Sequence, residues 1–186
     1  MELDAVELRT TYGVTDIMQP VVHLKNLLGV PVYGAADWKL LPAAIAGSGI
    51  VLAELVGPGH SILGKAVVGL GYGVVLAGAA AVHQIGHIST GQAIDAEMDA
   101  IVLRLPRPAE LYKHRGATVP MDVHRIRAAG GPMANFAVGL FARGISRKTG
   151  GRIGKATAFI NLAFALGSLI PVAGNDGEVL WLGKVD

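Results

Sequence analysis

Two histidines, His83 and His87, lie near the end of the apolar run Ile62–Ile88. A spacing of four residues is about one helical turn, so both imidazoles are expected on one face of a helix. Histidines held in a membrane-like segment indicate a function, and binding of a metal ion is the leading one. Between them stands Gln84, where a hydrolytic His-Glu-x-x-His zinc site carries its glutamate. The spacing therefore predicts a metal site, and the residue at position 84 leaves its chemistry open.

The composition is that of a membrane protein. Of the 186 residues, 52% are apolar and 16% are charged, whereas soluble domains carry about a quarter charged residues. The 26 glycines recur with alanines inside the apolar runs, which lets helix backbones approach closely in lipid. The net charge of +2 is too small, and the basic residues too scattered, to indicate nucleic-acid binding. The sequence contains no cysteine, which excludes disulfides and thiolate ligands.

Four apolar runs organise the chain. They predict an all-α polytopic membrane protein with about four transmembrane helices, near residues 40–56, 62–88, 131–145 and 156–173. Arg143 interrupts the third run, so we expect that helix to be short or strongly tilted. Residues 1–39 contain no run of the about 20 apolar residues that a span needs, and we expect them to lie in the membrane interface. Residues 40–186 then form the membrane core.

The segment 89–130 differs in character from the apolar runs around it. It carries many charged side chains, several prolines and short alternating pieces such as Ala100–Leu105. Alternation of this kind favours short strands. We therefore predict a surface loop that contains a small β element at the membrane.

The order of the spans places a carboxylate on the side of the histidines. The second span ends at His83 and His87, the third crosses away, and the fourth returns just before Asp176. Two histidines and one carboxylate leave a fourth position open for water, which is the arrangement of a catalytic zinc ion.

Three ordered stretches together resemble the site-2 protease family of intramembrane zinc metalloproteases. The family pattern is His-Glu-x-x-His, then Gly-Pro-x-x-Asn, then a segment ending in Asp-Gly. Here His83–His87 matches the first except at Gln84, Ala129–Phe136 matches the second, and the spacing from Pro171 to Asp176 matches the third. The resemblance covers about residues 62–180, and three motifs in order are much more specific than a histidine pair.

The resemblance implies a set of roles. His83, His87 and Asp176 would be the zinc ligands, and Asn135 would orient substrate or a reacting oxygen beside them. The loop 89–130 would guide an extended substrate strand by edge pairing. The expected partners are the lipid bilayer and other membrane proteins or transmembrane peptide segments. The resemblance further implies the plasma membrane of a bacterium or archaeon, with zinc on the cytosolic side.

Gln84 decides between two functional hypotheses. A carboxamide does not act as a base near neutral pH, and general acid–base help is worth about 10² to 10⁴ in rate. A native Gln84 indicates a catalytically impaired homologue that retains zinc and acts as a binding or structural subunit in a membrane complex. An engineered Gln84 would instead mark a zinc metalloendopeptidase of regulated intramembrane proteolysis, changed to trap substrate. Departures from the family pattern at three further positions favour the native residue: Ser168, Ala173 and Asn175.

Two readings without catalytic zinc also fit the histidine pair. The imidazoles could simply pack or form hydrogen bonds inside a helical bundle. They could also serve as axial ligands of a haem or another pigment between helices.

Overall fold

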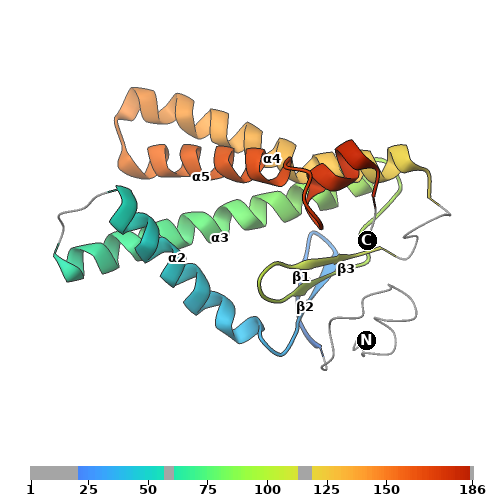
Figure 1. Ribbon diagram of the computed structural model, residues 1–186, viewed down its shortest axis with the longest axis horizontal. Helices are drawn as coiled ribbons and strands as arrows, with labels where there is room; N and C mark the ends of the chain where they lie inside the picture. Colours follow the sequence, from blue (N-terminus) through green and yellow to red (C-terminus); the bar gives the residue numbers. More distant parts are fainter. Residues whose placement is uncertain (1–20, 57–60, 113–118, 185–186) are drawn as a thin grey trace.

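A computed structural model describes residues 21–56, 61–112 and 119–184 of the chain (Figure 1). Four long helices and one small sheet make up this part of the protein. The helices are α2 (Leu41–Val56), α3 (Ile62–Ala93), α4 (Met121–Thr149) and α5 (Arg152–Ser168). The strands are β1 (Val22–Leu27), β2 (Val30–Gly34), β3 (Ala100–Leu103) and β4 (Ala109–Leu111), and two short helical turns complete the set, η1 (Trp38–Leu40) and η2 (Glu178–Leu182).

The sheet joins two hairpins that are distant in sequence. Its order is β1-β2-β3-β4, with antiparallel pairing inside each hairpin and parallel pairing between β2 and β3. The second hairpin is the β element predicted within 89–130. The first hairpin comes from the segment 1–39, for which no strands were predicted. The interfacial position expected for residues 1–39 stays a prediction, and residues 1–20 lie outside the described part of the chain.

One face of the sheet packs against the end of α3 that carries the histidines. Ile101 of β3 lies in a buried cluster with Ile88 of α3, Val30 and Met98. Glu110 of β4 is the register partner of Ile101. Because side chains of directly paired residues lie on the same face of a sheet, Glu110 also faces α3.

Glycines set the close contacts between helices. A Cβ atom on Gly49 of α2 would overlap the backbone of α3 at Gly69, and one on Gly86 of α3 would overlap the backbone of α4 at Gly130. Contacts of this kind need small residues, as the composition predicted.

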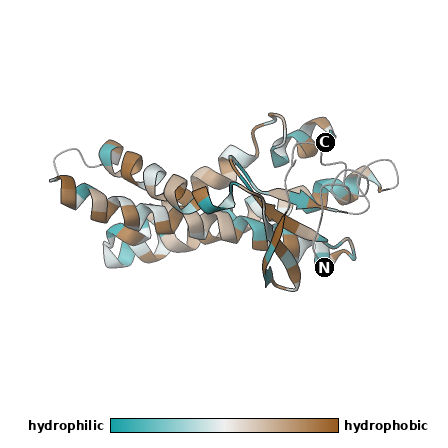
Figure 2. Cartoon of the chain, turned by 90° about the horizontal axis from the view of Figure 1, so that it is seen from below, coloured by the Kyte–Doolittle hydropathy of each residue, from teal (hydrophilic) through white to brown (hydrophobic). Residues whose placement is uncertain are grey.

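Within the described residues, two helices are long and apolar enough to cross a membrane: Trp38–Leu55, which contains most of α2, and α3. Only a small share of each is buried inside the protein. Ile62, Leu63 and Val74 of α3 are 90%, 75% and 73% exposed. Figure 2 shows hydrophobic residues spread along the helices, which is typical of a surface that faces lipid.

The last two helices differ in extent from the predicted spans. α4 is much longer than 131–145, and α5 begins and ends earlier than 156–173. The prediction followed apolar runs, whereas the helices continue through charged residues at their ends. Arg143 does not end α4, which continues to Thr149 and closes on Gly150 at a φ of 70°. Because only two of the described helices are long and apolar enough to cross a membrane, the prediction of about four transmembrane helices is not confirmed.

Candidate metal centre

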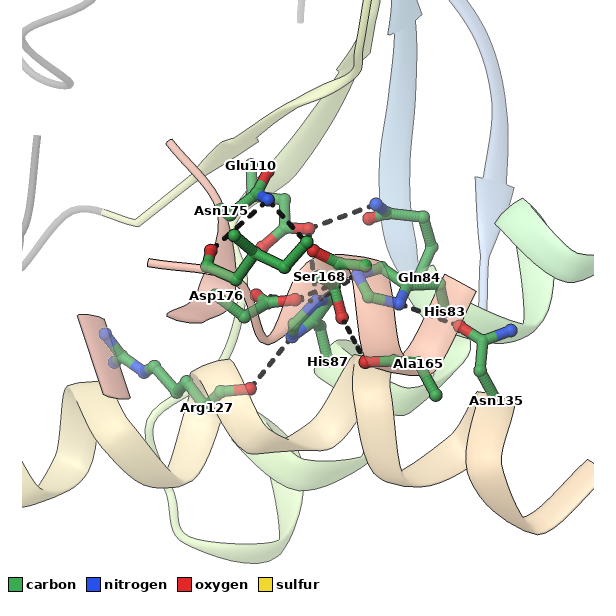
Figure 3. Close-up of polar contacts among 12 residues, drawn as sticks. His83, Gln84, His87, Glu110, Arg127, Asn135, Ala165, Ser168, Asn175 and Asp176 are labelled. Carbon is green, nitrogen blue, oxygen red and sulfur yellow. Dashed lines mark hydrogen bonds and ion pairs between the residues drawn. The ribbon is translucent and has the colours of Figure 1, made fainter. Parts of the chain in front are cut away.

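The side chains of His83, His87 and Asp176 converge on one point (Figure 3). Each offers a ligand atom, and these atoms all lie within 4.8 Å of one another. The two Nε2 atoms are 3.0 Å apart, and the Asp176 carboxylate oxygens lie 3.2 Å from His83 Nε2 and 3.3 Å from His87 Nε2. The structure thus brings together the three residues that the sequence analysis selected as ligands.

The hydrogen bond of His87 fixes which ring nitrogen carries its proton. Nδ1 of His87 lies 2.8 Å from the backbone carbonyl oxygen of Arg127 on α4. A carbonyl oxygen can only accept, so Nδ1–H donates and Nε2 is left with a lone pair. His87 is only 1% exposed, which holds the ring in this orientation.

The buried side-chain amide of Asn135 fixes which ring nitrogen of His83 carries the proton. Asn135 on α4 is fully buried, and its Nδ2 donates to the carbonyl oxygen of Ala79 and to Asn161 Oδ1, both at 2.9 Å. These two bonds turn Oδ1 of Asn135 toward Nδ1 of His83, 2.8 Å away. Nδ1–H of His83 therefore donates to Oδ1, and its Nε2 also presents a lone pair. Asn161 on α5 thus anchors the residue that orients a ligand.

The donor set fits a small divalent cation. Two Nε2 lone pairs that face each other at 3.0 Å, beside a carboxylate, repel one another unless a proton or a metal cation lies between them. A tetrahedral ion with bonds of about 2.0 to 2.2 Å separates its ligand atoms by about 3.3 to 3.6 Å. The three observed separations are close to that range. Outer hydrogen bonds to Nδ1 are also what zinc-binding histidines use to fix the ring.

Gly131 makes room for the pair of imidazoles. A Cβ atom on Gly131 would overlap both rings, with His83 Cε1 at 2.6 Å. The preceding residue, Gly130, lies against Gly86 and brings α4 close to α3. The two adjacent glycines therefore have separate tasks, one in helix contact and one at the metal centre.

A turn after α5, held by hydrogen bonds from two side chains, positions Asp176. The side chain of Asn175 donates to the carbonyl oxygen of Gly167 at 3.2 Å, near the end of α5. Glu178, which is buried, accepts from the backbone N–H of Gly174 at 2.7 Å. Asn175, one of the departures from the family pattern, thus helps to tie the turn that presents the carboxylate.

Gln84 lies on the sheet side of the metal centre, where it meets a carboxylate that the sequence analysis did not select. Its Nε2 donates to Oε1 of Glu110 at 3.0 Å (Figure 3). The same oxygen lies 3.6 Å from His87 Nε2. The sequence alone does not indicate Glu110, because its side chain faces α3 only through the pairing of β4 with β3. That pairing is decided by the tertiary structure.

Arg127 of α4 and Tyr112, the residue after β4, contact each other near Glu110. The guanidinium of Arg127 lies over the ring of Tyr112, 4.4 Å from its centroid, and its Nε donates to the carbonyl oxygen of Ala96 at 2.8 Å. Burial, and then the nearby charge of Glu110, raise the pKa of the Tyr112 hydroxyl well above its usual value. Burial lowers the pKa of Arg127. Tyr112 is therefore a neutral neighbour of Glu110.

Ser168 takes a local role. Its hydroxyl donates to the carbonyl oxygen of Ala165 within α5 at 3.2 Å. This bond turns the hydroxyl back onto its own helix.

The fold is similar to that of a site-2 protease. Among solved structures, the chain is similar to the site-2 protease from Methanocaldococcus jannaschii, with a TM-score of 0.62 and 17% sequence identity. The similarity covers 86% of this chain and 69% of that one. No family model matches the sequence, and no curated protein matches it. The likeness shows a site-2-protease-like fold.

Proposed function

We propose that this protein is a catalytically impaired, site-2-protease-like membrane protein that retains a zinc site and acts as a binding or structural subunit in a membrane complex. The observation that carries the proposal is the convergence of His83, His87 and Asp176 beside Gln84. The ligand atoms required for zinc are present, and the base required to use it is replaced.

The chain's own residues account for binding better than for catalysis. His83, His87 and Asp176 would hold zinc, which when bound would supply a Lewis acid. The hydrogen bonds to Asn135 and to the Arg127 carbonyl turn both Nε2 atoms toward the ion and select the tautomer of each neutral ring that leaves Nε2 free to bind it. Gln84 has no proton to exchange near neutral pH, so the chain lacks a proton carrier at the position where hydrolysis needs one.

The contact between Gln84 and Glu110 supports Gln84 as the native residue. An amide N–H donor faces a carboxylate oxygen at 3.0 Å. A glutamate at position 84 would set two carboxylates against each other at this distance, which is unfavourable because like charges repel. The amide N–H of Gln84 is therefore matched to Glu110, whereas its Oε1 is buried without a hydrogen-bond partner.

The proposal includes a membrane position for the whole helical body. α4 and α5 expose large apolar side chains, as α2 and α3 do: Met133, Phe136, Leu140, Phe141, Ile153, Phe159 and Leu166. This supports four spans, with the charged helix ends at the membrane surfaces. By analogy with the family we place the zinc side in the cytosol of a bacterial or archaeal cell.

Other membrane proteins or transmembrane segments are the proposed partners. β4 is an edge strand of the four-stranded sheet formed by the described residues, and it carries Glu110 next to the metal centre. An extended segment that added to this edge would run past the histidines.

Two measurements test the proposal. Elemental analysis of the full chain purified in detergent should give about one zinc per chain, and the variant His83→Ala should lose it. Incubation with candidate transmembrane peptides should give no zinc-dependent cleavage above that of the His83→Ala variant. Cleavage well above it, or a glutamate codon at position 84 of the natural gene, would overturn the proposal in favour of a protease. Iron or pigment absorbance in place of zinc would also overturn it.

A further inference from the structure

Glu110 is a carboxylate that the zinc site described above does not use. It lies on β4, opposite Ile101, on the face of the sheet that packs against α3. Its side chain is 25% exposed, so most of it is removed from water. Burial of a carboxylate is costly unless a cation or several hydrogen bonds compensate it.

Glu110 accepts a hydrogen bond from Gln84, and the cationic side chain near it, Arg127, lies over the ring of Tyr112. Oε1 accepts from Gln84 Nε2 at 3.0 Å, and Tyr112 is near enough for the charge of Glu110 to raise the pKa of its hydroxyl. Asp176, a second carboxylate, lies against the same histidines. Since His83 and His87 present lone pairs to this point, two negative charges meet there without a matching cation from the two rings. One divalent ion would balance both.

Oε1 of Glu110 lies beside the three-residue metal group, on the side of His87. It lies 3.6 Å from His87 Nε2. This is within the separation of about 3.3 to 3.6 Å between the ligand atoms of a tetrahedral ion. A site with two histidines, Asp176 and Glu110 has four protein ligands, which is the number found in closed structural zinc sites.

We propose that Glu110 is the fourth ligand of the metal centre and that Gln84 is the positioning residue that holds it there. This inference rests on the proposed zinc site and gives it a specific coordination. With Glu110 bound, the position that an intramembrane protease reserves for water is filled by the protein. Gln84 then has a structural role, because its amide N–H donates to the Glu110 carboxylate and holds that carboxylate in place.

The test uses the full chain in detergent, loaded with Co²⁺ in place of zinc, because the visible absorption of Co²⁺ reports its coordination. Azide serves as a small anionic probe for an open position. The variants are Glu110→Gln, which keeps the shape and removes the charge, and Glu97→Gln as a matched control. Glu97 lies in the connection between α3 and β3 and is exposed. Zinc affinity is measured in parallel by competition with a chromophoric chelator.

We expect the Co²⁺ spectrum of the unchanged protein to be insensitive to azide and that of Glu110→Gln to become sensitive. Loss of a residue that only supports a ligand weakens metal affinity by about 10- to 100-fold, so loss of a ligand should weaken zinc binding by about 100-fold or more. Glu97→Gln should bind like the unchanged protein.

Two results would overturn the assignment of Glu110. One is a Co²⁺ spectrum of the unchanged protein that responds to azide, which needs no variant to fold. The other is a zinc affinity of Glu110→Gln equal to that of Glu97→Gln. Either result leaves the three-ligand site intact. If the unchanged protein instead binds no more metal than His83→Ala, the proposed zinc site itself fails.

Discussion

Replacement of Asn135 by alanine tests the reasoning about how the metal ligands are oriented. Asn135 makes three hydrogen bonds from a fully buried position, to His83, to Ala79 and to Asn161. The alanine variant removes all three at once. It also leaves Nδ1–H of His83 without the acceptor that fixes its tautomer.

Asn135→Ala is expected to lower both the stability of the protein and its affinity for zinc. Hydrogen bonds between membrane helices are worth about 0.6 kcal/mol each on average, so three give about 2 kcal/mol of stability. Loss of an outer partner of a metal-binding histidine weakens metal affinity by about 10- to 100-fold. We therefore expect Asn135→Ala to unfold at a lower temperature when free of metal and to bind zinc about 10- to 100-fold more weakly.

Both effects are measurable on the purified chain in detergent. Thermal unfolding after chelator treatment gives the stability term, and competition with a chromophoric chelator gives the zinc affinity. Asn26→Ala, at an exposed asparagine of β1, is the matched control. If Asn135→Ala matches this control in both measurements, the network does not orient His83 and the reasoning fails.

Three further predictions concern the same centre. Gly131→Ala should abolish high-affinity zinc binding because its methyl group would overlap both imidazole rings, whereas Gly144→Ala, with open space around it, should bind normally in the same chelator competition. The exchange variant Gln84→Glu with Glu110→Gln should show zinc-dependent peptide cleavage that neither single change shows, because it restores a base beside an open position; absence of any gain in a peptide assay contradicts this. Glu178→Gln should weaken zinc affinity by about 10-fold, since the neutral side chain accepts more weakly from the turn that presents the Asp176 ligand; an unchanged affinity argues against that role.

The connection of the metal centre to the sheet also has a consequence for function. Glu110 belongs to an edge strand, and Gln84 contacts it directly. A partner segment that pairs with β4 would therefore act on the strand that carries a proposed metal ligand. If such a partner changed the metal affinity, metal binding would change the affinity for the partner by the same factor.

The local part of the site could be predicted from the sequence. The spacing of His83 and His87 puts both rings on one helical face, since the helix repeats every 3.6 residues. The order of the apolar runs brought Asp176 to the same end of the helical body. The helix limits were less predictable, because apolarity reports what faces lipid, whereas α4 continues into charged residues at both ends.

The spacing of residues along the chain thus determined that two imidazoles and one carboxylate could meet and that no base stands at position 84. Only the tertiary structure decided which nitrogen of each ring faces the centre, because the partners of Nδ1 come from α4. It also decided that Glu110 stands beside Gln84. That contact depends on the parallel pairing of β2 with β3 and on the sheet packing against α3, and such distant pairings have no periodic signal in a single sequence.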